Sequence, residues 1–158
     1  MNLVDGFISY IEAERRYSPL TVRNYRRDIA DFLEFIGVDK ESFDPNAIAR
    51  ADVEEWIVYL FEKRKLKAQS VNRSVATLRS FWKWMLGHGH ASRNVVKIIP
   101  QAKTSSPLPI FVPESRMKDV VKSLRLDIAS EDFERLRDAI IILLFYTAGL
   151  RLAELSNL

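Results

Sequence analysis

The chain has 158 residues, 47% of them hydrophobic and 28% charged, which is the balance of an ordinary globular protein. It contains no cysteine, which excludes disulfide bonds, thiolate metal sites and cysteine nucleophiles. No basic segment followed by an apolar run opens the chain, and its longest apolar stretch, 139–149, is too short to cross a bilayer, so we expect a cytoplasmic protein without a membrane partner.

The net charge of +3 is modest, but the charges are unevenly distributed. No acidic residue lies between Glu62 and Glu114, so the rest of the chain is net negative. A local positive field of this kind indicates a polyanionic partner, although lysine-rich helix ends are often only solvated. The ten positive residues of this acid-free interval are Lys63, Arg64, Lys65, Lys67, Arg73, Arg79, Lys83, Arg93, Lys97 and Lys103.

Apolar residues recur at helical spacing along most of the chain, which predicts an all-α fold. The first helix is expected at 2–14. The second opens with Ser18 as its cap and Pro19 at its first position, and Gly37 ends it. A connection at 42–49 then leads to the next helix.

Two further helices are predicted before residue 90. Asp52 is expected to cap the third, and a basic connection at 63–69 follows it. Ser70 is expected to cap the fourth helix, which reaches Leu86. The core stripe of that helix is predicted to comprise Val71, Val75, Leu78, Trp82 and Met85.

The stretch 100–113 holds four prolines and no strong periodicity, which is typical of a linker. We therefore expect one domain over residues 1–104 and a second over 107–158. The second domain is predicted to open with helices at 113–124 and 130–148. Residues 139–146 are apolar on every side of the later helix, so other elements must cover it, and we expect this second domain to be incomplete.

Two helix faces are candidates for contact with DNA. Arg23, Arg26 and Arg27 fall together on the second helix, and a basic surface of small residues lies opposite the core stripe of the fourth. On that surface arginine and lysine would bind phosphates, and other side chains would reach base edges. The fourth-helix candidates are Asn72, Arg73 and Thr77 for bases, with Arg79 and Lys83 for phosphates. In the alternative reading each arginine is a solvated residue or an intrahelical ion-pair partner, as for Arg27 with Asp31.

Other aromatic and imidazole side chains are given structural roles. Trp82 lies on the core stripe with Trp84 beside it, so packing is favoured over base stacking. His88 and His90 have no carboxylate or cysteine near them in sequence, so we expect loop residues and no metal site.

The last segment places Arg151 near a helix start, just after Gly149. There a guanidinium is suited to binding a phosphate, and Glu154 is close enough to orient it. Taken alone, this spacing favours a common surface ion pair over a phosphate site.

Four segments in register resemble the tyrosine recombinase (phage integrase) family, and the Xer-type and integron-like members most. The resemblance covers essentially the whole chain. The segments are Ser18-Pro19-Leu20-Thr21 with Tyr25-Arg26-Arg27-Asp28, Ser70-Val71-Asn72-Arg73 with Leu78-Arg79-Ser80-Phe81-Trp82, Pro107-Leu108-Pro109, and Arg137-Asp138-Ala139 through Gly149-Leu150-Arg151-Leu152-Ala153-Glu154-Leu155. The chain departs from the family at Asn94-Val95, where Asn-Pro is frequent.

The resemblance implies a SAM-like helical core-binding domain, followed by the first helices of a catalytic domain. It implies that Arg151 grips the scissile phosphate, supported by Glu154, and that no cofactor is needed, because a tyrosine stores the bond energy in a 3′-phosphotyrosyl intermediate. The parent enzyme would act as a tetramer on double-stranded DNA. Every tyrosine here lies upstream of Arg151, whereas the family's nucleophile lies downstream, so this chain is predicted to be inactive by itself.

Two other functions remain open from the sequence. One is a stand-alone, non-catalytic DNA-binding protein. The other is a helical protein-interaction module that docks a partner through the apolar helix around 139–148.

Overall fold

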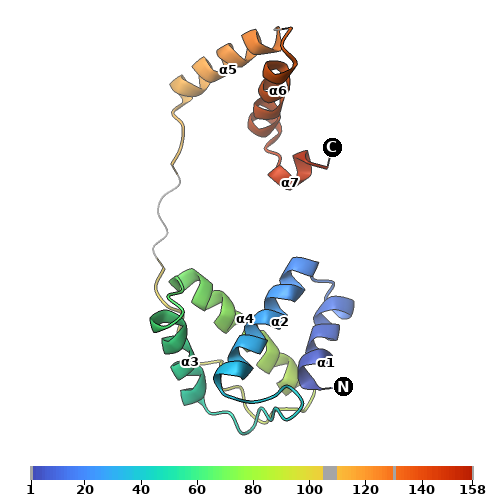
Figure 1. Ribbon diagram of the computed structural model, residues 1–158, viewed down its shortest axis with the longest axis vertical. Coiled ribbons are helices and arrows are strands. Elements are labelled where there is room, and N and C mark those ends of the chain that lie inside the picture. Colours follow the sequence, from blue (N-terminus) through green and yellow to red (C-terminus); the bar gives the residue numbers. More distant parts are fainter. Residues whose placement is uncertain (1, 105–109, 130, 158) are drawn as a thin grey trace. The chain divides into compact units, whose positions relative to one another are not determined.

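The computed structural model describes residues 2–104, 110–129 and 131–157 (Figure 1). Across these residues all regular elements are helices, as predicted. None of the helices within the described ranges is both long and apolar enough to span a membrane. The chain forms two compact units, Met1–Ser106 and Pro107–Leu158, and each is described by itself.

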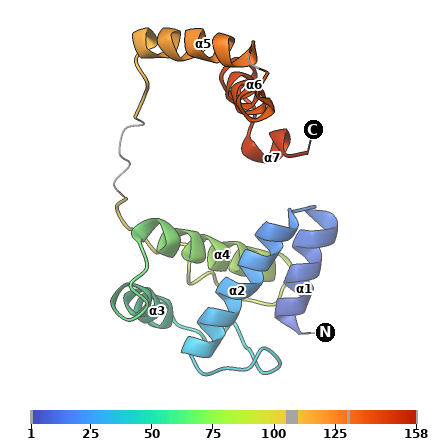
Figure 2. The same cartoon turned by 45° about the horizontal axis from the view of Figure 1, so that its top comes forward.

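Helix α4 (Ala68–Gly87) is the centre of the first unit. Helices α1 (Leu3–Ser9), α2 (Pro19–Phe35) and α3 (Arg50–Glu62) all pack against it (Figures 1 and 2). The predicted stripe of α4 is fully buried, together with aromatic side chains from the helices around it. The largest of these core side chains are Trp56, Trp82, Phe7, Phe32 and Phe81.

Both ends of α2 follow the sequence prediction. The Ser18 hydroxyl accepts a hydrogen bond from the Thr21 amide at 3.3 Å, and Pro19 occupies the first helical position. Gly37 follows the last turn with φ of +68°, a left-handed conformation that favours glycine.

The predicted starts of two helices are wrong by two or three residues. Helix α3 begins at Arg50, and Asp52 lies in its first turn, where its carboxylate accepts a 2.7 Å hydrogen bond from the amide of Ala49. Helix α4 begins at Ala68, so Ser70 is inside the helix and the basic connection is 63–67. A polar residue serves a helix N-terminus from the first turn as well as from the cap, so its presence alone does not locate the first residue.

The first predicted helix is divided in the structure. Helix α1 ends at Ser9, and a π-helical turn, η1 (Tyr10–Glu14), continues it. The amide of Arg15 donates to the carbonyl of Tyr10 at 3.1 Å, the wider hydrogen-bond spacing of a π-helix. Arg16 follows with φ of +51°, which is uncommon for a residue with a side chain.

After α4 the chain turns back across the core. Gly89 has φ of +75°, and the buried side chains Ala91, Val95, Val96 and Ile99 return the segment to the bundle. The segment 95–99 is therefore part of this core.

The second unit contains α5 (Glu114–Ile128), α6 (Phe133–Ala148) and the short α7 (Leu152–Leu155). Helix α5 continues past the predicted end at residue 124, and α6 begins after an Asp132 cap. Ser130, where the sequence analysis starts this helix, lies outside the described residues. Helices α5 and α6 pack together and bury Leu124 and Ala139, while Ile140, Ile142 and Tyr146 of α6 remain exposed.

Candidate nucleic-acid interface

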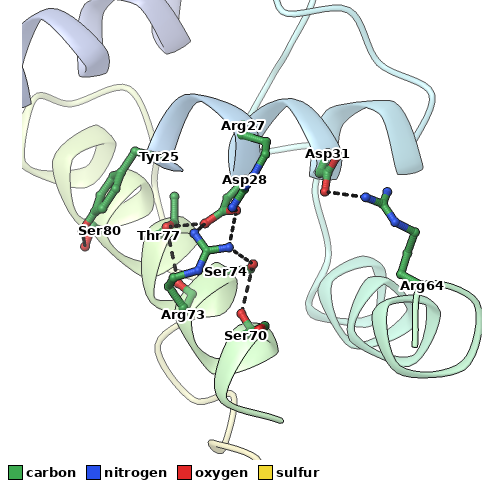
Figure 3. A network of polar contacts seen from close by, with 10 residues as sticks. All are labelled: Tyr25, Arg27, Asp28, Asp31, Arg64, Ser70, Arg73, Ser74, Thr77 and Ser80. Atoms are coloured by element: carbon green, nitrogen blue, oxygen red, sulfur yellow. Dashed lines mark hydrogen bonds and ion pairs between the residues drawn. The ribbon is translucent and has the colours of Figure 1, made fainter. Parts of the chain in front are cut away.

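A buried carboxylate joins α2 to α4. Asp28 of α2 is only 2% exposed, and its two oxygens accept hydrogen bonds from the guanidinium of Arg73 at 2.7 and 3.0 Å (Figure 3). The Thr77 hydroxyl donates a third bond at 3.0 Å. A carboxylate removed from water is tolerated only when it is paired and hydrogen-bonded, so Arg73 has a structural task in holding the two helices together.

The geometry does not suit Thr77 as a reader of base edges. Its side chain is 1% exposed and faces α2, where its hydroxyl is used by Asp28. It lies one helical turn beyond Arg73, on the side of α4 that the sequence analysis assigns to solvent. The α2 helix covers that side, which corrects the expectation for this residue.

Asn72 and Arg79 are also engaged by the protein's own backbone. The Asn72 amide donates to the carbonyl of Ala102 and accepts from its amide, both at 2.8 Å. Arg79 donates to the carbonyl of Ile99 at 3.0 Å. These two side chains hold residues 99–102 against α4, so in this structure the groups expected to meet DNA are occupied.

The exposed cations lie on α2 and at the end of α4. Arg23, Arg26, Arg27 and Lys83 are all exposed. Arg26 lies 3.7 Å from Asp5, so its charge is partly compensated. Arg23 and Lys83 form no ion pair with any carboxylate in the described part of the chain.

The ion pair expected between Arg27 and Asp31 does not form. Arg27 lies 3.7 Å from Asp28 instead, and Asp31 pairs with Arg64 at 3.6 Å (Figure 3). The Tyr59 hydroxyl and then Asp31 raise the pKa of Arg64, so its charge is secure. Asp31 therefore pairs with a residue from the connection after α3, and Arg27 pairs with the adjacent residue of its own helix.

Most of the positive side chains of the acid-free interval are open to solvent. Of its ten positive side chains only Arg73 and Arg79 are partly buried, and the other eight are exposed. The interval therefore presents its charge outward, as a positive surface must if it is to meet a polyanion.

Arg151 precedes α7 and is held by Glu154. Its amide donates to Oε2 of Glu154 at 2.8 Å, and its Nη1 donates to Oε1 at 3.1 Å. Gly149 makes this turn possible with φ of +62°. The Arg151 side chain is 85% exposed, so Glu154 orients the guanidinium from one side while its outer edge stays open to a ligand.

Comparison with known proteins identifies the family. The family model described as phage integrase, N-terminal SAM-like domain, matches residues 4–89, more than half of the chain. The chain belongs to the tyrosine recombinase (phage integrase) family.

Curated relatives align with this chain along its whole length. The tyrosine recombinase XerC of Pediococcus pentosaceus is 30% identical over 158 residues, covering all of this chain and 51% of the relative. The tyrosine recombinase XerD of Rickettsia bellii is 31% identical, and the alignment covers 100% of this chain and 50% of the relative. The chain therefore spans about half the length of the relatives that it matches.

Solved integrase structures share the fold. The integrase from mycobacterium phage Brujita matches with a TM-score of 0.59 and 18% identity, over 94% of this chain and 46% of the other. The Tn1549 transposon integrase, solved in complex with circular intermediate DNA, gives a TM-score of 0.63 and 15% identity, over 100% and 49%.

The remaining aromatic and imidazole side chains of the first unit pack together. Trp82 is fully buried, as predicted, and Trp84 is partly buried against the same core. His88 and His90 lie beside Trp84, with ring centroids at 4.9 and 5.6 Å. Throughout the described residues, no three histidine, cysteine, aspartate or glutamate side chains are grouped to bind a metal.

The sequence analysis quotes Asp28 in a family motif but does not predict that this carboxylate is buried and joins α2 to α4. Asp28 is followed directly by the buried Ile29, and it lies one turn before Phe32 of the core. An acidic residue at the edge of an apolar stripe indicates a buried partner, because an unpaired carboxylate there would be unfavourable. That signal was present in the sequence, but it did not identify Arg73 as the partner.

Proposed function

We propose that this chain is the DNA-binding part of a site-specific tyrosine recombinase. Residues 1 to about 104 form its core-binding domain, and residues 107–158 are the opening of its catalytic domain. The family match supports this assignment, as does the likeness to a transposon integrase that was solved with DNA.

The exposed basic surface of the first unit carries the proposal. Arg23, Arg26 and Arg27 of α2, with Lys83 of α4, contact the phosphates of double-stranded DNA. The buried Asp28–Arg73 pair holds these two helices together, so the positions of their exposed cations relative to one another are fixed. Preorganised side chains lose less conformational entropy on binding than mobile ones do.

In the second unit, Arg151 contacts the scissile phosphate of the parent enzyme and Glu154 orients it. A tyrosine oxygen attacks that phosphorus, the 5′-hydroxyl end leaves, and a 3′-phosphotyrosyl bond stores the energy for rejoining. Arg151 stabilises the charge that develops on the phosphate oxygens. The parent acts without a cofactor, as a tetramer on paired half-sites. The 158 residues alone do not cleave DNA, and detection of a covalent adduct with them would contradict this.

Fluorescence anisotropy on duplex DNA across a salt series tests the proposal. The test variant carries Arg23→Gln, Arg27→Gln and Lys83→Gln, because Arg73 and Arg79 also hold the fold. The matched control changes three exposed cations that have carboxylate partners, Lys40, Arg50 and Arg135, to glutamine.

We expect steep salt dependence for the wild type and a slope smaller by about 2.7 for the test variant, since each lost phosphate contact removes about 0.9. The control should keep the wild-type slope. If the wild type does not bind duplex DNA at low salt, the basic interval is only a solvated surface.

One observation favours a second candidate, a helical interaction module. Ile142 and Tyr146, one turn apart on α6, are 42% and 54% exposed, which is an apolar surface suited to a protein partner. This function predicts little affinity for DNA, and self-association that is lost when Ile142 is changed to Asp. Size-exclusion chromatography with light scattering measures that loss.

A further inference from the structure

An aromatic pocket lies on the first unit between η1, α2 and α4. Its volume is about 290 Å³, near the lower end of the range for small-molecule sites. Five aromatic side chains line it: Phe7, Tyr10, Tyr17, Tyr25 and Trp84. The Tyr17 and Tyr25 rings meet edge to face at 5.9 Å, and the Phe7 and Trp84 centroids lie 5.7 Å apart. Tyr10, Tyr17, Tyr25 and Trp84 are partly exposed, so their rings can contact a ligand, whereas the Phe7 ring beside them is buried.

The polar groups of the pocket are suited to an anion. Arg15 and Lys83 contribute to its lining and are both exposed, so they stand at its mouth. Among the described residues that line the pocket, none is acidic. The hydroxyls of Tyr25 and Ser80 lie 3.5 Å apart, a contact long enough for either to turn toward a ligand.

The backbone beside the pocket has an unusual conformation. The π-helical turn η1 and the left-handed Arg16 come directly before Tyr17, and they place Arg15 and Tyr17 at the pocket. The Tyr17 hydroxyl, by its hydrogen bond to Arg15, raises the pKa of that guanidinium. Single π-turns and left-handed residues with side chains cost free energy and are frequent at functional sites.

We infer that this pocket binds one nucleotide unit, with its base against the aromatic rings and its phosphate between Arg15 and Lys83. Aromatic faces accept any base by stacking, and the paired cations bind phosphate. The nucleotide is either free or displaced from a DNA strand. The inference rests on the proposed function, because Lys83 belongs to the proposed DNA surface and makes the pocket continuous with it.

Trp84 provides a built-in reporter for the test. The chain has three tryptophans, and the other two, Trp56 and Trp82, are 0% exposed. Deoxyadenosine monophosphate at millimolar concentration should quench the fluorescence saturably, and Trp84→Phe should abolish the quenching. Deoxyadenosine and inorganic phosphate, each lacking half of the ligand, should bind more weakly. Arg15→Gln should lower the affinity for the nucleotide by about tenfold, while Arg50→Gln on α3 should leave that affinity unchanged.

A DNA arm distinguishes the two sources of the nucleotide. Duplexes with and without one unpaired 2-aminopurine are compared. If Arg15→Gln lowers the affinity for the duplex with the unpaired base more than the affinity for the fully paired duplex, the pocket takes a base from DNA. If Arg15→Gln lowers the affinity for both duplexes equally, while the wild type binds the mononucleotide, the ligand is a free nucleotide. Absence of saturable quenching by the mononucleotide, or equal behaviour of Arg15→Gln and Arg50→Gln, would overturn the inference.

The same samples separate this inference from the proposed function. If the chain binds duplex DNA with a steep salt slope but the mononucleotide does not quench its fluorescence, the pocket inference is contradicted and the DNA-binding function stands. If the mononucleotide quenches the fluorescence but the chain does not bind duplex DNA, the pocket inference stands and the DNA-binding function is contradicted.

Discussion

At the scale of single residues, arginines of the same chain have opposite tasks. Arg73 and Arg79 are hydrogen-bonded to a buried carboxylate and to a backbone carbonyl, whereas Arg23 projects from α2 without an ion-pair partner among the described residues. The difference comes from Asp28, because a carboxylate that is 2% exposed requires a cation beside it. We therefore propose DNA contacts only for helix arginines whose guanidinium is not hydrogen-bonded to another group of the protein.

The first prediction concerns this pair. Arg73→Ala should lower the free energy of unfolding by about 3 kcal/mol, because it leaves the buried Asp28 without its bidentate partner. Urea denaturation measures the change. Arg23→Ala, on the exposed side of α2, should stay within about 0.5 kcal/mol of the wild type. Equal stability of the two variants would show that Arg73 does not hold α2 to α4.

At the scale of elements, α4 serves three neighbours at once. One side supplies the core, a second receives Asp28 of α2, and a third binds residues 99–102 through Asn72 and Arg79. Little of the helix is left over for a ligand except near Lys83. The DNA surface that we propose therefore relies on α2 more than the sequence analysis expects.

A second prediction tests the contact between α4 and the segment after it. Asn72→Ala removes both hydrogen bonds to Ala102, so the amide of Ala102 should exchange its hydrogen about tenfold faster. Hydrogen exchange followed by NMR measures this rate. Gln69→Ala, an exposed change on the same helix, should leave the rate unaltered. An unchanged rate in Asn72→Ala would mean that other contacts hold the segment.

A third prediction concerns the turn before Arg151. Gly149 has φ of +62°, a conformation that a branched side chain resists. Gly149→Val should therefore lower the free energy of unfolding of the second unit by about 1–2 kcal/mol. Gly149→Asn should cost less, since asparagine tolerates it. Thermal unfolding followed by circular dichroism compares the two variants. A larger loss for asparagine would contradict this account of the turn.

At the scale of the whole molecule, the two units differ in how much they bury. The first unit has a continuous core that includes three fully buried rings from α4 and α3, Trp56, Phe81 and Trp82. In the second unit, Leu124 and Ala139 are the buried hydrophobic residues among those described. Stability follows the apolar area removed from water, so the first unit should be much the more stable.

The fourth prediction follows from this difference. Limited proteolysis should cut first within 107–158 and leave a resistant product that contains α1 to α4. Mass spectrometry identifies the cuts, and a polypeptide of residues 1–104 should unfold at nearly the temperature of that product. Early cuts within α2 or α4 would show that the first unit does not fold by itself.

Local sequence patterns determined the features that depend on neighbouring residues. Helical periodicity predicted the helices and the buried stripe of α4, and Ser18, Gly37 and Gly149 marked helix ends through their own conformational preferences. The motifs around Arg151 also predicted the family. The starts of α3 and α4 and the π-turn at Tyr10–Glu14 were not predicted, because several registers satisfy the same local pattern.

Only the tertiary structure decided which polar residues are free. Asp28 and Arg73 are 45 residues apart, and Asn72 and Ala102 are 30 apart, so no local pattern reports that they meet. The same holds for the aromatic pocket, whose walls come from η1, α2 and α4. Side-chain type determines which bonds a residue can make, but burial and distant partners determine which of them it does make.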